Sequence, residues 1–99
     1  MSQPPSRDDD AELVLNKVRV GGRAASLYVY RDRLVITTDT EERTIPMGEL
    51  QRVATRRWWR GARLLLALEH GEIVQVRRLE SSKCRIAHRI IIDIARGEH

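Results

Sequence analysis

Hydrophobic and polar residues alternate along most of the chain after residue 12, which is the spacing of β-strands with one buried face. The alternation is clearest at residues 25–30 and 34–38, on either side of a polar turn at 31–33. Less regular or shorter apolar runs predict five more strands, at 13–20, 43–45, 50–57, 64–68 and 73–76. Gly21-Gly22 and His70-Gly71 mark turns between strands. The pattern therefore predicts seven short antiparallel strands.

The last segment has the spacing of an amphipathic helix. Its apolar positions recur at intervals of three or four residues: Cys84, Ala87, Ile90, Ile91 and Ile94. We expect Ser81 or Ser82 to cap the helix N-terminus with its hydroxyl, and Gly97 to end the helix. The sequence thus predicts one helix near residues 82–96, whose apolar stripe closes the open end of a sheet folded on itself.

Length and composition fit one small globular domain. The chain has 99 residues and no Phe, so its core must be built from Leu, Ile, Val and Ala. Residues 1–11 combine a Pro pair with an acidic run and are expected to form a disordered tail before a domain at 12–97. A single cysteine, no apolar run of about 20 residues and no hydrophobic leader predict a cytoplasmic protein.

Charge is spread unevenly along the chain. The net charge is +4, but residues 13–97 hold 17 basic and nine acidic side chains and carry +8. A basic domain with an acidic tail attracts phosphates, membrane surfaces or acidic proteins. Sixteen of the 18 basic residues are Arg, a bias that codon usage in a GC-rich genome also produces. Local clustering of charge is therefore more informative than the net charge.

Three sequence runs, in this order before a terminal helix, resemble small bacterial pleckstrin-homology-like domains. They are LYVYRDRLVI at 27–36, TIPMGELQRV at 44–53 and LLLALEHGEIVQVRRL at 64–79. The resemblance covers residues 12–96 and implies a mainly β, seven-stranded antiparallel sandwich or partly open barrel capped by one C-terminal helix. It implies a fold that serves mostly as a binding platform.

The resemblance does not extend to an inositol-phosphate site. Family members that bind such ligands carry a Lys…Arg-x-Arg pattern across the first hairpin. Here that region holds Lys17, Arg19 and Arg23 and has no Arg-x-Arg. The resemblance therefore implies the fold without a lipid site.

Catalytic chemistry has little support in this sequence. It contains no glycine-rich phosphate loop and no G-x-S-x-G motif. Cys84 and His88 lie four residues apart on the expected helix, but a closed zinc site needs four ligands. We interpret them as a core thiol beside a surface histidine. We expect no enzyme activity, no metal and no cofactor.

The densest cluster of candidate binding residues lies in an expected hairpin loop at 58–61 and in the residues directly beside it. It contains both tryptophans and four arginines: Arg56, Arg57, Trp58, Trp59, Arg60 and Arg63. Arg presents a planar donor fork to phosphates and carboxylates, and Trp supplies a large apolar contact area. A hairpin around His70-Gly71 brings Arg77 and Arg78 near Arg63 and completes one basic end. The alternative is that both tryptophans fold back over the sandwich mouth with arginines stacked on them.

The run at 64–68 is apolar on both faces. Strand geometry places Leu64 and Leu66 on one face, and Leu65 and Ala67 on the other. One face belongs to the core, and the other must be covered by the helix, the Trp pair or a second subunit. These four residues are therefore candidates for self-association.

Together these observations predict an adaptor that binds a protein partner through the loop with the two tryptophans and its neighbouring arginines (the Trp-Arg loop, residues 56–63) and through the basic end. They also predict self-association. Binding of nucleic acid or of an anionic membrane through the arginines is the alternative. Against nucleic acid, Lys is scarce and no known motif is present. The opposite charge of residues 8–12 also predicts a tail that shields the basic end in cis.

Overall fold

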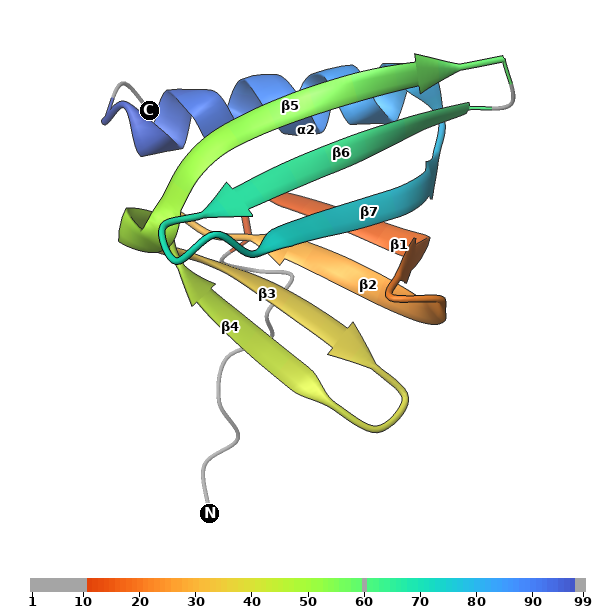
Figure 1. Cartoon of the computed structure of the whole chain (residues 1–99), viewed down its shortest axis with the longest axis horizontal. Helices are drawn as coiled ribbons and strands as arrows, with labels where there is room; N and C mark the ends of the chain where they lie inside the picture. Colours follow the sequence, from red (N-terminus) through yellow and green to blue (C-terminus); the bar gives the residue numbers. More distant parts are fainter. Residues whose placement is uncertain (1–10, 60, 98–99) are drawn as a thin grey trace.

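The computed structural model describes residues 11–59 and 61–97, without the side chain of Trp58. Its elements are β1 (Leu13–Val20), β2 (Arg23–Val29), β3 (Arg33–Thr38), β4 (Glu42–Pro46), the short 3-10 helix η1 (Met47–Glu49), β5 (Leu50–Trp58), β6 (Gly61–Leu68), β7 (Ile73–Leu79) and α2 (Ser81–Ala95). The strands form one antiparallel sheet in the order β4-β3-β2-β1-β7-β6-β5 (Figure 1). The predicted seven strands followed by one helix are confirmed.

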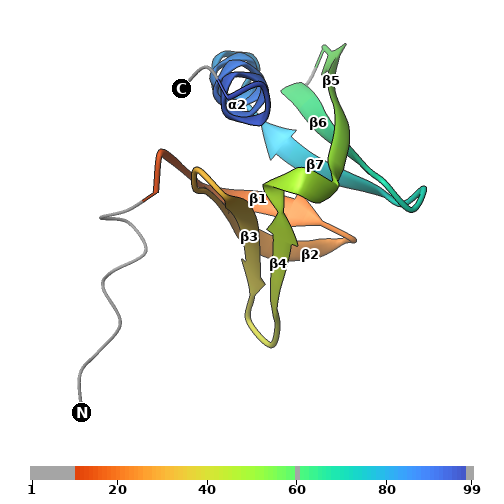
Figure 2. The ribbon, with the colours of Figure 1, turned by 90° about the vertical axis from the view of Figure 1, so that its left-hand side faces the viewer.

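The sheet folds back on itself, so that its β1–β4 half and its β5–β7 half enclose one core (Figures 1 and 2). Helix α2 packs mainly on β5 and β6. Its buried residues are four of the five in the predicted apolar stripe, Cys84, Ala87, Ile91 and Ile94, and Ile90 is partly buried. Among the described residues no helix has the length and apolar character needed to cross a bilayer.

Strand β6 shows how the apolar run at 64–68 is used. Leu64 and Leu66 are completely buried inside the monomer, whereas Leu65 and Ala67 are half-buried on the opposite face. The expectation that Leu64 and Leu66 take part in self-association is therefore wrong, because strand alternation commits both to the core. Only Leu65 and Ala67 remain on a face that a second subunit can reach.

A β-bulge explains the irregular spacing of the first strand. The pairing of β1 with β2 shifts register between Leu15 and Val18, and both of these side chains are buried. Asn16 and Lys17 lie between them and are both exposed. Lys17 has φ 59°, a left-handed conformation that costs a non-glycine residue about 1–2 kcal/mol. The inserted residue lets both flanking side chains point inward.

Strand β7 carries a second bulge of the same kind. Its pairing with β6 shifts register opposite Arg77 and Arg78, and Arg78 has φ 61°. Both arginines are exposed, although the flanking Val76 and Leu79 are buried. Strict alternation would point Arg78 toward the core. The bulge instead places two consecutive arginines on the outer surface.

The helix termini differ in how well they match the sequence. The prediction that Ser81 or Ser82 caps the helix is wrong, because Glu80 is the N-cap residue and forms no side-chain capping bond. Strand β7 runs to Leu79, so the chain enters the helix directly after one extended residue. At the other end Gly97 has φ 74°, which confirms that it ends the helix.

Replacing the two neighbouring leucines of β6 separately tests this assignment of faces. Leu66→Ala should lower the free energy of unfolding by about 2–5 kcal/mol, because it opens a cavity in the core. Leu65→Ala should lower it by less than about 1.5 kcal/mol. Urea denaturation measures both values. Equal losses would show that the outer face of β6 is also buried, and would contradict the monomeric packing described above.

Candidate functional site

An open groove of about 970 Å³ lies where β1, β6 and β7 meet the start of α2. We call it the basic groove, and its lining residues are Arg19, Gly22, Gly61, Ala62, Arg63, Arg77, Arg78, Leu79, Glu80 and Ser81. Four of these are arginines, which come from three different strands. Among the described residues of the lining, Glu80 is the one that is acidic. The lining thus carries a net positive charge.

Strand pairing holds the arginines of the basic groove together. Arg19 of β1 is the direct cross-strand partner of Arg77 in β7. Arg63 of β6 lies opposite the bulge that carries Arg77 and Arg78. Like charges at such positions repel, and their repulsion destabilises the sheet. Strand pairing therefore fixes the positions of these arginines, although their positive charges repel one another.

The groove arginines differ in their contacts. Arg19 donates a hydrogen bond to the carbonyl oxygen of Gly22, at 2.6 Å, and Arg63 contacts the side-chain oxygen of Gln75 at 3.5 Å. Within the described part of the chain, Arg77 and Arg78 have no side-chain hydrogen bond or ion pair. Their guanidinium groups are exposed and can accept an anionic ligand without breaking an existing interaction.

The structure brings together only part of the predicted basic end. Arg63, Arg77 and Arg78 line one groove as predicted. Arg56 is paired with Arg63 and Arg57 with Ala62, so Arg56 and Arg57 point to opposite faces of β5. Neither of them lines the groove. The expectation that all these arginines form one surface is therefore wrong.

Some of the predicted binding residues lie outside the part of the chain that the structure describes, or next to its ends. Arg60 and the side chain of Trp58 lie outside the described residues, as do residues 1–10 of the expected tail. Trp59 follows the end of β5, and its side chain is 82% exposed. Trp59 therefore does not fold back over the core.

Sequence reasoning missed Arg19 as a site residue. It enters the groove only because β1 pairs with β7, two strands that are distant in the sequence. The nearby Lys17 is also exposed, at the bulge of β1. A basic first hairpin was visible in the sequence, but nothing in its local pattern showed which strand would lie beside it.

Cys84 and His88 contact different backbone carbonyls. The thiol of Cys84 donates to the oxygen of Arg63 at 3.4 Å, and Nε2 of His88 lies 3.2 Å from the oxygen of Val53. Burial raises the pKa of the Cys84 thiol, which keeps it protonated at neutral pH. These contacts support the interpretation of a core thiol and a histidine that joins α2 to β5.

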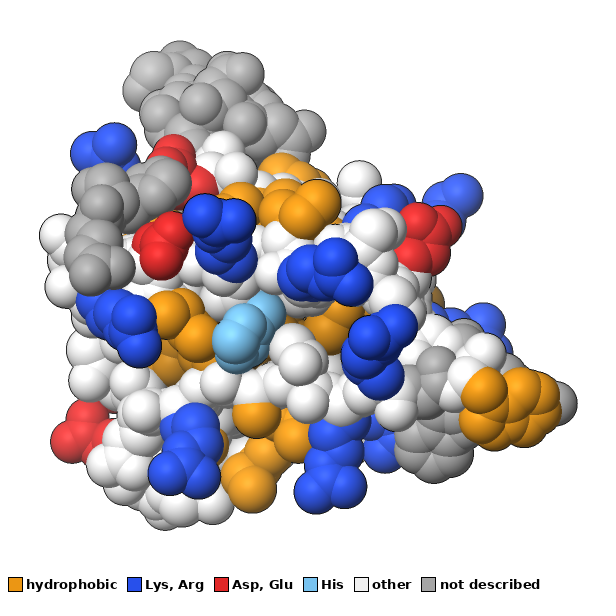
Figure 3. Space-filling model, turned by 90° about the horizontal axis from the view of Figure 1, so that it is seen from above, with side chains coloured by type: hydrophobic (Ala, Val, Ile, Leu, Met, Phe, Trp, Pro, Cys, Tyr) orange, Lys and Arg blue, Asp and Glu red, His pale blue; other side chains and the backbone are white. Residues whose placement is uncertain are grey.

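The face of the molecule that carries α2 is also rich in cations. Lys and Arg side chains are scattered over it, with hydrophobic groups between them, and the few acidic side chains visible lie toward its margins (Figure 3). Arg52 of β5 and Arg89 of α2 are exposed and lie outside the basic groove. Positive charge is therefore not confined to the groove, which is distinguished by its concavity and its converging strands.

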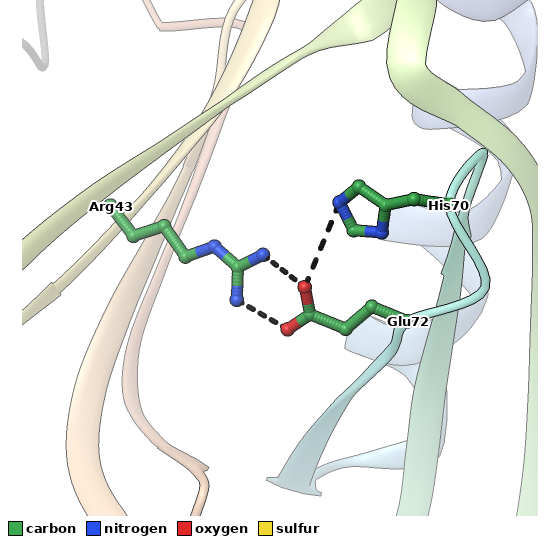
Figure 4. Close-up of polar contacts among 3 residues, drawn as sticks. All are labelled: Arg43, His70 and Glu72. Carbon is green, nitrogen blue, oxygen red and sulfur yellow. Dashed lines mark hydrogen bonds and ion pairs between the residues drawn. The ribbon is translucent and has the colours of Figure 1, made fainter.

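A smaller hollow of about 450 Å³ shares Gly22 and Arg77 with the basic groove. Its lining includes Arg43 of β4 and Glu72, which form a two-pronged ion pair with N···O distances of 2.6 and 2.5 Å (Figure 4). His70 approaches the same carboxylate at 4.0 Å. The hydrogen bonds from Arg43 lower the pKa of Glu72 and raise that of Arg43. This contact joins β4 to the β6–β7 hairpin.

Comparison with known proteins identifies the fold. No protein-family model matches the chain, and no curated protein matches it. The pleckstrin homology domain of USP37 is similar, with a TM-score of 0.70, 14% identity, and coverage of 87% of this chain and 96% of that one. A chain of the Spt16D Pob3N heterodimer is also similar, with a TM-score of 0.75 and 8% identity.

The second match covers 85% of this chain, which spans half the length of the Spt16D Pob3N chain. Such low identities establish the architecture and leave ligand and partner open. The chain therefore has a pleckstrin-homology-like fold, as the sequence resemblance implied.

Glycine substitutions at the two bulge arginines test whether the fold holds Arg78 at an energetic cost. Arg78→Gly should raise the free energy of unfolding by up to about 1 kcal/mol, because glycine adopts positive φ without strain. Arg77→Gly removes the same charge from an extended residue and should lower it by about 0.5–1 kcal/mol. Thermal melts compare the two variants. Lower stability of the Arg78 variant would contradict a strained bulge.

The Arg43–Glu72 pair predicts a pH-dependent contribution to stability. Because the folded state lowers the pKa of Glu72, the stabilisation is present above the ordinary carboxyl pKa and is lost as the pH falls through the folded value. Glu72→Gln should melt below the wild type at neutral pH, and the difference should vanish in acid. Glu69→Gln, on the same hairpin, is the control. A difference that persists in acid would exclude the ion pair as its cause.

Proposed function

We propose that the protein is a non-enzymatic binding module that holds an acidic segment of a partner protein in the basic groove. The observation that carries this proposal is the convergence of Arg19, Arg63, Arg77 and Arg78 from three strands around one concavity. Two of these guanidinium groups, Arg77 and Arg78, have no side-chain partner in the described part of the chain. Carboxylates match the donor fork of Arg in charge and geometry.

The shape of the groove favours a protein segment over nucleic acid. Its walls also include Gly61 and the largely buried Ala62 and Leu79, so part of the lining between the arginines is uncharged. The cations converge on a hollow, whereas a duplex needs a track of contacts along its length. An anionic membrane likewise presents a flat surface to a recessed site.

Trp59 is proposed as an apolar anchor beside this charged site. It lies close in sequence to Gly61, which lines the groove, and 82% of its side chain is exposed. Tryptophan contributes strongly to protein interfaces because it buries a large area with few torsions to freeze. The combination of a charged groove with one large apolar side chain fits a partner that is acidic but not purely polar.

Shielding of the groove by the acidic tail in cis is disfavoured by the position where the tail joins the domain. The amide of Glu12 donates to the oxygen of Val29, at the end of the β1–β2 hairpin away from Gly22. The eight residues of β1 span about 26 Å between this point and the groove. We therefore propose that the groove binds a segment of another molecule. The cytoplasmic location expected from the sequence remains a prediction.

Binding to a labelled peptide of eight glutamates and one central leucine tests the proposal. Arg77→Glu/Arg78→Glu should weaken binding at least about tenfold, measured by fluorescence anisotropy at low salt. Arg52→Glu/Arg89→Glu makes the same charge change outside the groove and should stay within about threefold. Trp59→Ala should weaken binding about fivefold.

Two competing probes decide the class of partner. A single-stranded oligonucleotide and vesicles containing one-third phosphatidylserine are titrated under the same conditions. If either binds more tightly than the peptide and depends on Arg77 and Arg78, an acidic protein segment is the wrong ligand. Equal weakening of peptide binding by the groove variant and by the control variant would show attraction by net charge alone and would overturn the groove as the site.

A further inference from the structure

The β3–β4 hairpin ends in the most acidic exposed turn of the described chain. Asp39, Glu41 and Glu42 lie within four consecutive positions, and all three are exposed. Neither Asp39 nor Glu41 forms an ion pair with another residue that the structure describes. We call these three residues the acidic tip. It has the charge that the basic groove is proposed to bind.

Local hydrogen bonds hold the acidic tip in one conformation. The hydroxyl of Thr38 accepts hydrogen bonds from the amides of Glu41, at 3.0 Å, and Thr40, at 3.4 Å. The amide of Thr38 donates to the oxygen of Glu41 at 2.8 Å. Arg23 lies beside the turn and donates to the hydroxyl of Thr40 at 3.0 Å. A turn that is ordered before it binds loses little conformational entropy on binding.

The acidic tip and the basic groove lie toward the same end of the molecule. Figure 1 shows the β1–β2, β3–β4 and β5–β6 connections at this end, and the β6–β7 turn and η1 at the other. Gly22 of the β1–β2 turn lines the groove, and Arg23, the next residue, contacts Thr40 in the turn that carries the acidic tip. The two charged features are thus neighbours on either side of one glycine turn.

We propose that a second copy of this chain occupies the basic groove, with the acidic tip of each copy in the groove of the other. A two-fold axis near the β1–β2 turn relates two surfaces that each carry one acidic and one basic feature, so both contacts form at once. Gly21 and Gly22 suit such an axis, because an added Cβ would meet nothing within 4 Å at either position. The surface there is open to a neighbouring molecule.

This inference rests on the proposed anion-binding role of the groove and adds a form of regulation. Self-association occupies Arg77 and Arg78, so an acidic partner must displace the acidic tip of the neighbouring copy before it binds. Dimer and partner complex are then mutually exclusive, and their balance depends on the concentrations of the chain and of the partner. Leu65 and Ala67, the remaining sequence-predicted candidates, have no part in this interface.

A charge-swap experiment tests the dimer directly. Light scattering after size-exclusion chromatography should show a wild-type dimer at about 0.05 M salt and a monomer at about 0.5 M. The groove variant Arg77→Glu/Arg78→Glu and the tip variant Asp39→Arg/Glu41→Arg should each be monomeric, because each opposes like charges. Each should weaken dimerisation at least tenfold. An equimolar mixture of the two should form a heterodimer, because both contacts then regain opposite charges.

The mixture also controls for folding, since misfolded variants would not restore an assembly. Asp39→Asn/Glu41→Gln provides a milder tip variant, which should weaken the dimer without reversing its charge. A wild type that is monomeric at low salt would overturn the proposal. A dimer that survives both charge reversals would also overturn it and would point to another surface.

Peptide binding separates failure of this inference from failure of the proposed function. The tip variant cannot dimerise but keeps an intact groove, so it should bind the glutamate peptide more tightly than the wild type. If it binds the peptide only as well as the wild type, self-association through the groove is excluded while the groove remains a binding site. If the tip variant does not bind the peptide at all, the groove function and the inference both fail.

Discussion

The architecture depends on a short seam between β1 and β7. Within the described chain, strand pairing joins the two halves of the sheet at only two residue pairs, Arg19 with Arg77 and Val20 with Val76. Each strand bulges just beyond the first of these pairs, at Lys17 and at Arg78, and the strands part there. Further cohesion of the two halves comes from the shared core, from α2, which packs on both β1 and β6, and from the Arg43–Glu72 ion pair. The basic groove lies on the surface at the point where β1 and β7 separate.

The seam between β1 and β7 also places backbone strain and like charges beside the proposed binding site. Hydrophobic burial of Val76 and Leu79 on either side of the β7 bulge holds a left-handed arginine in place. Cross-strand pairing holds Arg19 and Arg77 side by side despite their like charge. Strain and repulsion of this kind persist only where surrounding packing over-determines the backbone. An anion that binds here relieves repulsion that the folded chain otherwise carries.

The sequence pattern was sufficient to predict the strands and the helix. It was not sufficient to predict the bulges, the cross-strand neighbours or the residue at which the helix begins. Alternation and helical spacing predicted seven strands, a C-terminal helix and its buried stripe, because burial of one face imposes those periods locally. The bulge at Arg78 could not be predicted. One inserted residue reverses which face of the strand the following side chains occupy, and no local sequence signal marks the insertion. Arg19 was missed because its partner Arg77 is distant in the sequence. The serine cap failed because the length of β7 fixed where the helix begins.

The two edge strands of the sheet, β4 and β5, each carry a feature that hinders edge-to-edge pairing with another molecule. Strand β4 ends in Pro46, which has no amide hydrogen to offer to a neighbouring strand. On the other edge, His88 of α2 lies against the carbonyl oxygen of Val53 in β5 and occupies a group that an added strand would need. Sheets with unblocked edges template aggregation by continuous pairing. Each edge strand thus has one backbone position that cannot pair freely with an added strand, which disfavours continuous pairing between molecules.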